Sequence, residues 1–264
     1  MPDRKTALIT GASFGIGLEL ARIFAREGHD LVLVARSGDK LRQLASELEK
    51  AHGTRSLILA ADLSDPGAAA YVLDQTTRAS ITVDILVNNA GFGQYGFFAE
   101  NDLEECLRQI QLNVTTLTHL MRLYLPGMIE RARTERRTGR ILNVASTAAF
   151  QAGPLMAVYY ATKAYVLHLS EAIANELQGT GVTATCLCPG PTATEFQERA
   201  KITGIRLTAY GTMDARTVAE DGYRALMAGK PVVISGFKNW LVAQSVRFSP
   251  RRLVTAVARK LQER

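Results

Sequence analysis

Residues 7–24 read ALITGASFGIGLELARIF, and this stretch decides the fold. The apolar run that ends at Ile9 predicts a short buried strand, and the apolar spacing after Gly17 predicts a helix. Glycines 11, 15 and 17 allow a tight turn and let backbone N–H groups approach a pyrophosphate at the helix N-terminus. The spacing is G-x-x-x-G-x-G, and a glycine-rich turn alone is also compatible with a purely structural role. The strand–turn–helix order favours a dinucleotide site at this turn.

Strands and helices then alternate with short connections. Strands are predicted at 31–35, 56–61, 85–88, 140–145, 182–187 and 231–235, and helices at 41–51, 66–79, 102–133 (kinked at Pro126-Gly127) and 156–178. Strands separated by helices imply parallel pairing with right-handed crossovers. The sequence therefore predicts an α/β fold, a Rossmann-type doubly wound parallel sheet of about seven strands flanked by helices. No helix is assigned inside 192–212, because Gly204 and Gly211 interrupt the periodicity.

Composition is typical of one globular enzyme domain. The chain has 264 residues, of which 47% are hydrophobic and 21% charged, with no apolar run long enough to span a membrane. Residues 1–4 lead directly into the first strand, so no signal peptide is expected and a cytoplasmic location is predicted. The three cysteines, Cys106, Cys186 and Cys188, form no C-x-x-C motif and are expected to be reduced thiols. The four histidines show no ligand spacing, so no metal is expected.

Positive charge is concentrated at the end of the chain. Residues 237–264 carry seven Lys or Arg and one Glu, a difference of +6 that equals the net charge of the whole chain. We therefore divide the chain into a dinucleotide-binding catalytic domain, 1–236, and a basic C-terminal extension packed on it, 237–264. Pro250 is expected to begin a helix with Leu253, Val257 and Leu261 on one side.

Two interpretations of this extension stay open. The helix either packs on the domain or a second subunit, or it makes weak contact with an anionic membrane surface, helped by Trp240 and Phe248. Nucleic-acid binding is not expected, since no recognised motif accompanies the charge.

Tyr159 and Lys163 are the first candidates for chemistry, and Ser146 precedes them. A tyrosine has an ordinary pKa of about 10 and is a poor acid or base near neutral pH. An ammonium one helical turn away favours the phenolate, which predicts a lowered pKa for Tyr159. Tyr160 has Ala164 four residues later and lacks that cation.

Seven motifs occur in a fixed order along the chain. They are TGASFGIG at 10–17, Asp62-Leu63, NNAG at 88–91, Asn113, Ser146, YYATK at 159–163, and Pro189-Gly190. In these motifs the chain resembles the short-chain dehydrogenase/reductase family, compact single-domain type, from about Lys5 to Gly236. The segments LVLVARSGDKL and PGPTATEF look most like bacterial carbonyl reductases and their 3-oxoacyl or hydroxysteroid relatives.

The resemblance implies a catalytic set of Asn113, Ser146, Tyr159 and Lys163. Tyr159 would be the general acid in reduction and the base in oxidation, and Lys163 would lower its pKa and bind the nicotinamide ribose. Ser146 would hydrogen-bond the carbonyl oxygen, and Asn113 would hold a water that links Lys163 to solvent. Alternatively, Asn113 is a surface amide and Ser146 an N-terminal cap.

The resemblance also implies the cofactor contacts. Strand two ends in Ala35-Arg36 without a carboxylate, so Arg36 is free to pair with a 2′-phosphate, and NADP(H) is predicted. Otherwise Arg36 is a solvated cation of the loop. Ser13 and Lys40 are possible second contacts to the 2′-phosphate. Asp62 could instead cap the following helix, a position for which Asp65 is also suited. The expected cofactor-binding residues are Gly11, Ser13, Gly15, Ile16, Gly17, Arg36, Asp62, Leu63, Asn89, Gly91, Tyr159, Lys163, Pro189, Gly190, Thr192 and Thr194.

The loops after the central strands are expected to line an apolar substrate pocket. The residues are Phe92, Gln94, Tyr95, Phe97, Phe98, Ala148, Phe150, Gln151, Met156, Pro191 and Phe196. We expect an oxidoreductase that transfers hydride between NADP(H) and a carbonyl or secondary alcohol, with a neutral hydrophobic ketone or 3-oxoacyl-type substrate. The alternative is a non-catalytic NADP-binding sensor or scaffold protein; a longer-chain epimerase fits the glycine spacing poorly. The resemblance implies a homodimer or homotetramer through helices 102–133 and 156–178.

Overall fold

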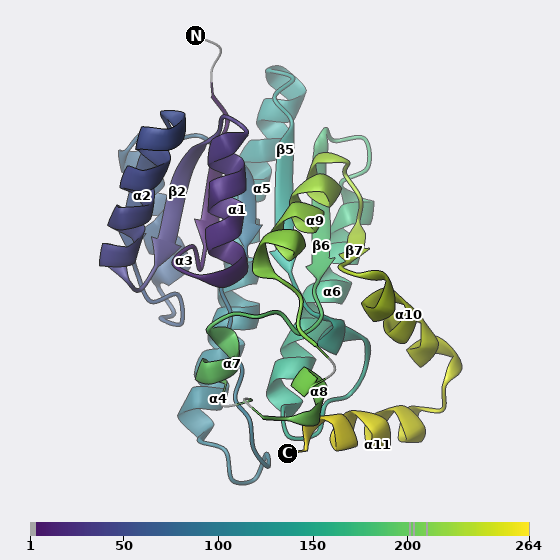
Figure 1. The fold of residues 1–264 in the computed structure, drawn as a ribbon. Coiled ribbons are helices and arrows are strands. Elements are labelled where there is room, and N and C mark those ends of the chain that lie inside the picture. Colours follow the sequence, from purple (N-terminus) through teal and green to yellow (C-terminus); the bar gives the residue numbers. More distant parts are fainter. Residues whose placement is uncertain (1–3, 201, 203, 210, 264) are drawn as a thin grey trace.

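A parallel sheet forms the centre of the molecule (Figure 1). The computed structural model describes residues 4–200, 202, 204–209 and 211–263. Within these residues seven strands pair in the order β3-β2-β1-β4-β5-β6-β7, and every pair is parallel. The strands are β1 (Thr6–Thr10), β2 (Asp30–Ala35), β3 (Ser56–Ala60), β4 (Val83–Asn88), β5 (Gly139–Val144), β6 (Val182–Cys188) and β7 (Val232–Ile234). The predicted doubly wound α/β fold is confirmed.

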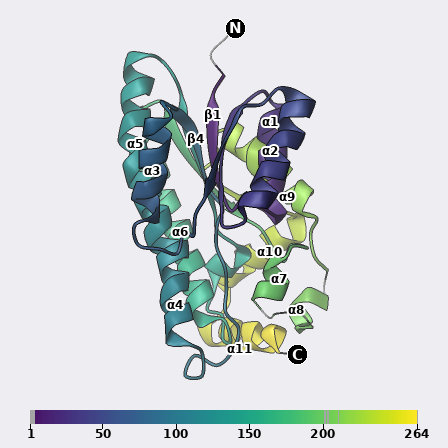
Figure 2. The same cartoon turned by 90° about the vertical axis from the view of Figure 1, so that its left-hand side faces the viewer.

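Helices cover both faces of the sheet (Figure 2). One layer contains α1 (Gly15–Arg26), α2 (Gly38–His52) and α9 (Ala215–Met227). The other contains α3 (Ala68–Arg78), α5 (Leu117–Thr134) and α6 (Ala157–Glu176). In β1, Leu8 packs into the second layer's core, whereas Ala7 and Ile9 pack into the first. The strands are therefore apolar on both faces, as expected for a covered parallel sheet.

The segment predicted as one helix over 102–133 has three parts. Helix α4 (Leu103–Ile110) is capped by Asp102, whose side chain accepts a hydrogen bond from the Glu105 N–H at 2.8 Å. A π-helical segment, Gln111–Thr116, separates α4 from α5, and Pro126 lies inside α5. The change of helix type at 111–116 alters which side chains face the sheet, and such π segments are frequent at functional sites.

The remaining elements lie around and beyond the carboxyl ends of the strands (Figure 1). They are a short 3₁₀ helix (Thr147–Phe150), α7 (Phe196–Arg199), α8 (Arg206–Ala209), α10 (Phe237–Ser245), a 3₁₀ turn (Val246–Phe248) and α11 (Arg251–Gln262). Helix α11 packs against α8, although no helix was predicted inside 192–212. Among the described residues, no helix is both long and apolar enough to cross a bilayer.

Candidate active site

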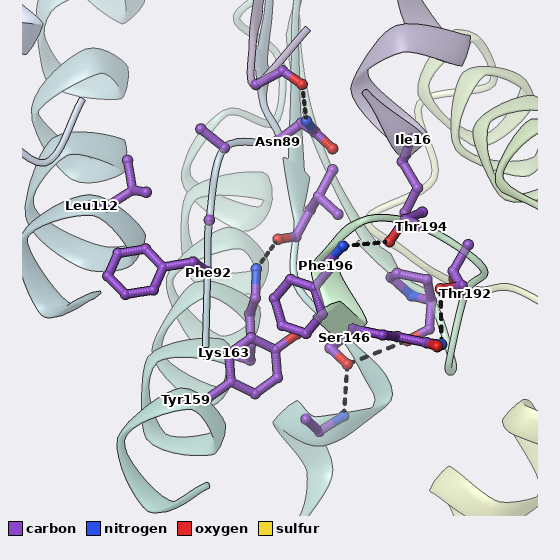
Figure 3. A pocket seen from close by; sticks show the side chains of 18 of the residues that line it. Ile16, Asn89, Phe92, Leu112, Ser146, Tyr159, Lys163, Thr192, Thr194 and Phe196 are labelled. Carbon is purple, nitrogen blue, oxygen red and sulfur yellow. Dashed lines mark hydrogen bonds between the residues drawn. The ribbon is translucent and has the colours of Figure 1, made fainter. Parts of the chain in front are cut away.

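A cavity of about 490 Å³ opens at the carboxyl ends of the central strands (Figure 3). Strand order reverses between β1 and β4, and a crevice at such a point is where ligands bind in doubly wound folds. The lining runs continuously from the glycine turn, past Arg36 and Asp62, to Tyr159 and Phe196. A single cavity therefore joins the predicted cofactor site to the predicted catalytic residues.

The glycine turn forms one end of this cavity. Gly11 and Gly15 have φ of 67° and 56°, which favours glycine, and a Cβ on Gly17 would lie 2.3 Å from the Gly11 carbonyl oxygen. The Asn89 amide nitrogen, which the sequence assigned to the ribose, donates to the carbonyl oxygens of Thr10 at 2.9 Å and Gly11 at 3.2 Å. Asn89 thus ties the turn to the end of β4 and holds the start of α1 against the cavity, a cradle that fits a phosphate group.

Arg36 lies at the rim beside Asp62. Its guanidinium is 3.8 Å from the Asp62 carboxylate, and the Arg108 guanidinium lies 3.1 Å from the same oxygen. Burial alone would raise the pKa of Asp62, but hydrogen bonds from Ser64 and the two arginine charges lower it below its ordinary value. Asp62 is not a helix cap, since its carboxylate accepts from Ser64 and α3 begins only at Ala68. Leu63, also predicted as a contact, lines the cavity next to it.

The loop after β6 lines the cofactor end of the cavity, whereas Lys40, a possible second contact, is not among the described lining residues. Lys40 pairs with Glu195 at 3.2 Å, on the loop that carries Thr194. Thr194 faces the glycine turn, because a Cβ on Gly15 would lie 2.9 Å from its methyl group. The other predicted contacts that line the cavity here are Ser13, Ile16, Gly91, Pro189, Gly190 and Thr192.

Ser146, Tyr159 and Lys163 meet at the other end of the cofactor crevice (Figure 3). Ser146 follows β5, whereas Tyr159 and Lys163 lie one turn apart on α6. Tyr159 and Ser146 both line the cavity, and the Lys163 ammonium lies 5.8 Å from the centre of the tyrosine ring. Lys163 donates to the Val144 carbonyl oxygen at 2.8 Å. Three elements distant in sequence thus bring the predicted residues together.

The pKa shifts at this cluster differ from the sequence prediction. Burial raises the pKa of Tyr159, and only the polar side chain of Ser146 opposes this rise. Burial also lowers the pKa of Lys163 to about 8. The expected lowering of the Tyr159 pKa by Lys163 is not found in this structure, because desolvation of the phenol is the larger effect and the ammonium is directed at Val144.

Asn113 lies in the π-helical segment and is 2% exposed, so it is not a surface amide. Its amide nitrogen donates to the Phe92 carbonyl oxygen at 2.9 Å and to the Thr162 hydroxyl at 3.1 Å. Its amide oxygen accepts from the Phe92 N–H at 3.2 Å. Asn113 therefore fixes the loop after β4 against α6, the helix that carries Tyr159.

Ser146 has the capping role, one of the two roles that the sequence left open. Its hydroxyl oxygen accepts from the Ala148 N–H at 3.1 Å and caps the 3₁₀ helix at 147–150. The same hydroxyl donates to the Pro189 carbonyl oxygen at 3.4 Å, and Ser146 lines the cavity. These two contacts fix the orientation of the Ser146 side chain.

The substrate end of the cavity is apolar, as predicted, but with a partly different lining. Phe92, Ala148, Met156, Pro191 and Phe196 line it. Of the other predicted residues, Phe97 and Phe98 are exposed, and the described cavity lining contains neither of them, nor Gln94, Tyr95, Phe150 or Gln151. Lining residues that the sequence analysis missed are Leu112, Tyr160, Gln197, Ile202, Ile205, Leu207 and Gln262. Most come from distant segments without regular periodicity, so no local signal identifies them.

Comparisons with known proteins match most of the chain to one family. A family model described as short chain dehydrogenase matches residues 5–203. The ketoacyl reductase HetN of Nostoc sp. is 36% identical over 186 residues, 70% of this chain and 63% of that protein. A short-chain dehydrogenase from Sphingobium yanoikuyae, in complex with NADPH, is 36% identical with a TM-score of 0.80, covering 92% of this chain and 94% of the other. A 3-ketoacyl-(acyl-carrier-protein) reductase from Brucella melitensis, complexed with NADH, is 28% identical with a TM-score of 0.77, covering 88% and 97%.

The fold and the family model therefore define a protein of the short-chain dehydrogenase type. The chain belongs to the short-chain dehydrogenase family, whose members act on CH–OH and carbonyl groups. It spans about three fifths of the length of the first curated relatives it matches, 61% and 63%. Since the matched structures hold NADPH in one case and NADH in another, the family leaves open which of the two this chain prefers. Within the described residues, no three His, Cys, Asp or Glu side chains group as a metal site would require.

Proposed function

We propose that this chain is an NADP(H)-dependent reductase of neutral, hydrophobic ketones, or of 3-oxoacyl-type substrates, and a dehydrogenase of the matching alcohols. The observation that carries the proposal is the meeting of Ser146, Tyr159 and Lys163 in the cavity that begins at the glycine turn. A pure binding protein, the rival function, has no need for a buried phenol, hydroxyl and amine at one end of its ligand site.

The chain's own residues supply proton transfer and charge stabilisation. The bound nicotinamide would supply or accept the hydride. In reduction, the Ser146 hydroxyl donates a hydrogen bond to the substrate oxygen, where negative charge develops. Tyr159 donates its proton to the same oxygen, and the raised pKa of this phenol keeps the proton in place until that oxygen becomes basic. In oxidation, Tyr159 accepts the proton as the phenolate, and the Lys163 ammonium would stabilise this anion only by turning from the Val144 carbonyl oxygen toward the phenol.

Gly91 supports the proposed water between Asn113 and Lys163. A Cβ on Gly91 would lie 3.0 Å from the Asn113 amide oxygen and 3.5 Å from the Lys163 nitrogen. The missing side chain leaves space between an acceptor and a donor, and a bridging water needs such polar partners. This water would connect Lys163 to solvent and return the proton that Tyr159 donates.

Arg36 supports the choice of NADP(H). It stands at the end of β2, lines the cavity and follows Ala35, so no carboxylate at that position repels a 2′-phosphate. One charge-assisted hydrogen bond contributes about 1.5–3 kcal/mol, or roughly a 10- to 150-fold preference. We expect Arg36→Ala to lose NADPH efficiency by this factor and to keep NADH efficiency. Arg42→Ala, an exposed arginine on α2, is the matched control. A wild type that prefers NADH refutes the assignment.

The apolar lining supports the substrate class, as does the resemblance to a ketoacyl reductase. The test is NADPH oxidation by purified protein with a panel of ketones. We expect aryl and long-chain ketones to be turned over with higher kcat/KM than small keto acids. Turnover with keto acids alone contradicts the substrate class. NADPH binding without turnover of any ketone favours the sensor or scaffold function.

A second copy of the chain is the proposed partner of the outer face of α4 and α6. Leu103, Leu107, Ile110 and Tyr165 are large apolar residues exposed on these helices. Such a face is typical of an interface between subunits. We expect a homodimer or homotetramer by light scattering and a smaller species for Leu107→Glu. A wild type that is monomeric at micromolar concentration contradicts this part of the proposal.

The basic extension, 237–264, is proposed to contact an anionic membrane surface. Phe237 and Phe248 are 75% and 89% exposed, and Trp240, Leu253 and Val257 are exposed too. Lysine and arginine side chains at 238, 247, 251 and 252 accompany them on α10, the 3₁₀ turn and α11. Two copies meeting through this surface would oppose like charges, whereas anionic lipid would neutralise them.

The membrane contact is tested by sedimentation with liposomes at low salt. We expect the wild-type protein to bind vesicles that contain phosphatidylserine, and the Phe248→Ser variant to bind them more weakly. In the cell, the proposed contact is with the inner face of the cytoplasmic membrane. Lys50→Ser, on the distant helix α2, is the control. Equal sedimentation with neutral and anionic vesicles contradicts the proposal. The division of the chain into a catalytic domain, 1–236, and a C-terminal extension, 237–264, stays a proposal. Helices α10 and α11 of the extension contact β7 and α8 of the catalytic part.

A further inference from the structure

The end of α11 reaches back into the substrate end of the cavity. Gln262 is 1% exposed and lines the cavity, although it lies 102 residues from Tyr160 in the chain. The backbone on either side holds it there: the Tyr95 hydroxyl donates to the Gln262 carbonyl oxygen at 2.8 Å, and the Arg206 N–H donates to the Glu263 carbonyl oxygen at 3.0 Å. The position of this side chain is therefore fixed by two separate segments.

The Gln262 side chain makes one of the four hydrogen bonds that an amide can make. Its amide nitrogen donates to the Tyr160 hydroxyl, 2.5 Å away. Its amide oxygen, Oε1, is fully buried and has no hydrogen-bond partner among the described residues. A buried acceptor without a partner costs about 1–3 kcal/mol, and such groups are rare in folded proteins.

Among the described residues no donor pairs with the Gln262 amide oxygen. Ile202, Ile205 and Met156 form an apolar cluster with Tyr160, the hydrogen-bond partner of the Gln262 amide nitrogen. A molecule that enters the cavity could therefore supply the donor for this acceptor. Gln262 contacts Tyr160, and the Tyr160 ring lies 6.2 Å from the ring of Tyr159, the proposed proton donor. A substrate held at Tyr159 would extend toward Gln262.

We propose that Gln262 determines substrate specificity by accepting a hydrogen bond from a hydroxyl group remote from the reacting carbonyl. The substrate is then an apolar ketone that carries a second, donor-bearing group. A second carbonyl or a carboxylate at this place would bring two acceptors together and bind poorly. A site built to pair with a hydroxyl discriminates against the analogue that lacks it. This inference rests on the proposed reductase function.

The test compares ketones that differ only in a remote hydroxyl. Suitable pairs are benzylacetone with its para-hydroxy derivative, and phenylcyclohexanone with its para-hydroxy derivative, in which saturated carbons insulate the carbonyl. We expect wild type to prefer the hydroxylated member of at least one pair in kcat/KM. Gln262→Met removes the acceptor at nearly constant shape, and we expect the preference to fall about 2- to 12-fold, mainly through KM, as for one neutral hydrogen bond.

Two further variants separate recognition from structure. Gln262→Glu keeps an acceptor oxygen and is expected to retain the preference, which a purely structural role does not explain. Gln178→Met, the same change at an exposed site just beyond α6, is expected to leave every rate unchanged. An unchanged preference in Gln262→Met, an equal fall for both members of each pair, or a wild type indifferent to the hydroxyl overturns the inference. Absence of turnover with every ketone in wild type instead refutes the reductase function.

Discussion

Replacing Lys163 by methionine is expected to stabilise the folded protein at neutral pH, although it removes a proposed catalytic group. Lys163 is 6% exposed, and burial lowers its pKa from 10.5 to about 8. At pH values below 8 the folded protein must hold a proton that its interior disfavours. The difference of about 2.5 pKa units corresponds to a cost of about 3 kcal/mol in the free energy of unfolding.

Methionine removes this cost and one hydrogen bond. The bond from Lys163 to the Val144 carbonyl oxygen is 2.8 Å long, and its loss is expected to cost about 1 kcal/mol. The net gain near pH 7 is therefore about 2 kcal/mol. Between pH 8 and 10.5 the unfolded chain keeps a proton that the folded protein has released, so wild-type stability rises with pH in this window. The advantage of the variant shrinks by about 2 kcal/mol from about pH 7 to 9.5.

The assay is urea unfolding of the protein without cofactor, followed by circular dichroism at both pH values. Lys230→Met, at an exposed lysine before β7, is the control and is expected to change stability by less than about 0.5 kcal/mol. A Lys163→Met variant that is less stable than wild type at neutral pH, by an amount independent of pH, contradicts the reasoning. Such a result means that Lys163 is not strained by burial.

Two further substitutions test the turn and the core. Gly17→Ala places a Cβ 2.3 Å from the Gly11 carbonyl oxygen, so we expect NADPH affinity to fall at least about tenfold in a fluorescence titration. In the control Gly67→Ala the added Cβ meets no atom within 4 Å, and we expect this variant to bind NADPH as wild type does. Equal NADPH affinities of the Gly17→Ala variant and wild type contradict the proposed cradle. Phe24→Ala removes a fully buried ring and is expected to cost about 3–5 kcal/mol in unfolding free energy, whereas the exposed Phe98→Ala is expected to cost little. A loss of under 1 kcal/mol at Phe24 contradicts the described core.

Local patterns predicted most of the fold. The turn at Gly11–Gly17 is determined by backbone geometry within a few residues, and the strand–helix alternation by apolar spacing. The π-helical segment at 111–116 was not predicted, because its apolar spacing is compatible with one continuous helix. The sequence thus places Asn113 in a helix and cannot show which side chains that helix turns toward the cavity.

The site was predicted where its residues are neighbours in sequence or carry family motifs. Tyr159 and Lys163 share one helical turn, so their proximity follows from the helix itself. The direction of the Tyr159 pKa shift depends on burial by distant segments, which no local pattern contains. Gln262 enters the cavity only because α11 folds back over α8, and its spacing indicates no more than a helix.

The central claim is that Tyr159 transfers the proton in a cavity that it shares with the cofactor. The most direct measurement is single-turnover oxidation of NADPH by wild type and Tyr159→Phe with a ketone that wild type reduces, with NADPH affinity measured on the same samples. Because Tyr159 is also an expected cofactor contact, the account predicts a small change in NADPH affinity and a hydride-transfer rate at least about 100-fold lower in the variant at saturating NADPH, as for loss of a general acid. A variant that binds NADPH and reduces the ketone at nearly the wild-type rate contradicts it.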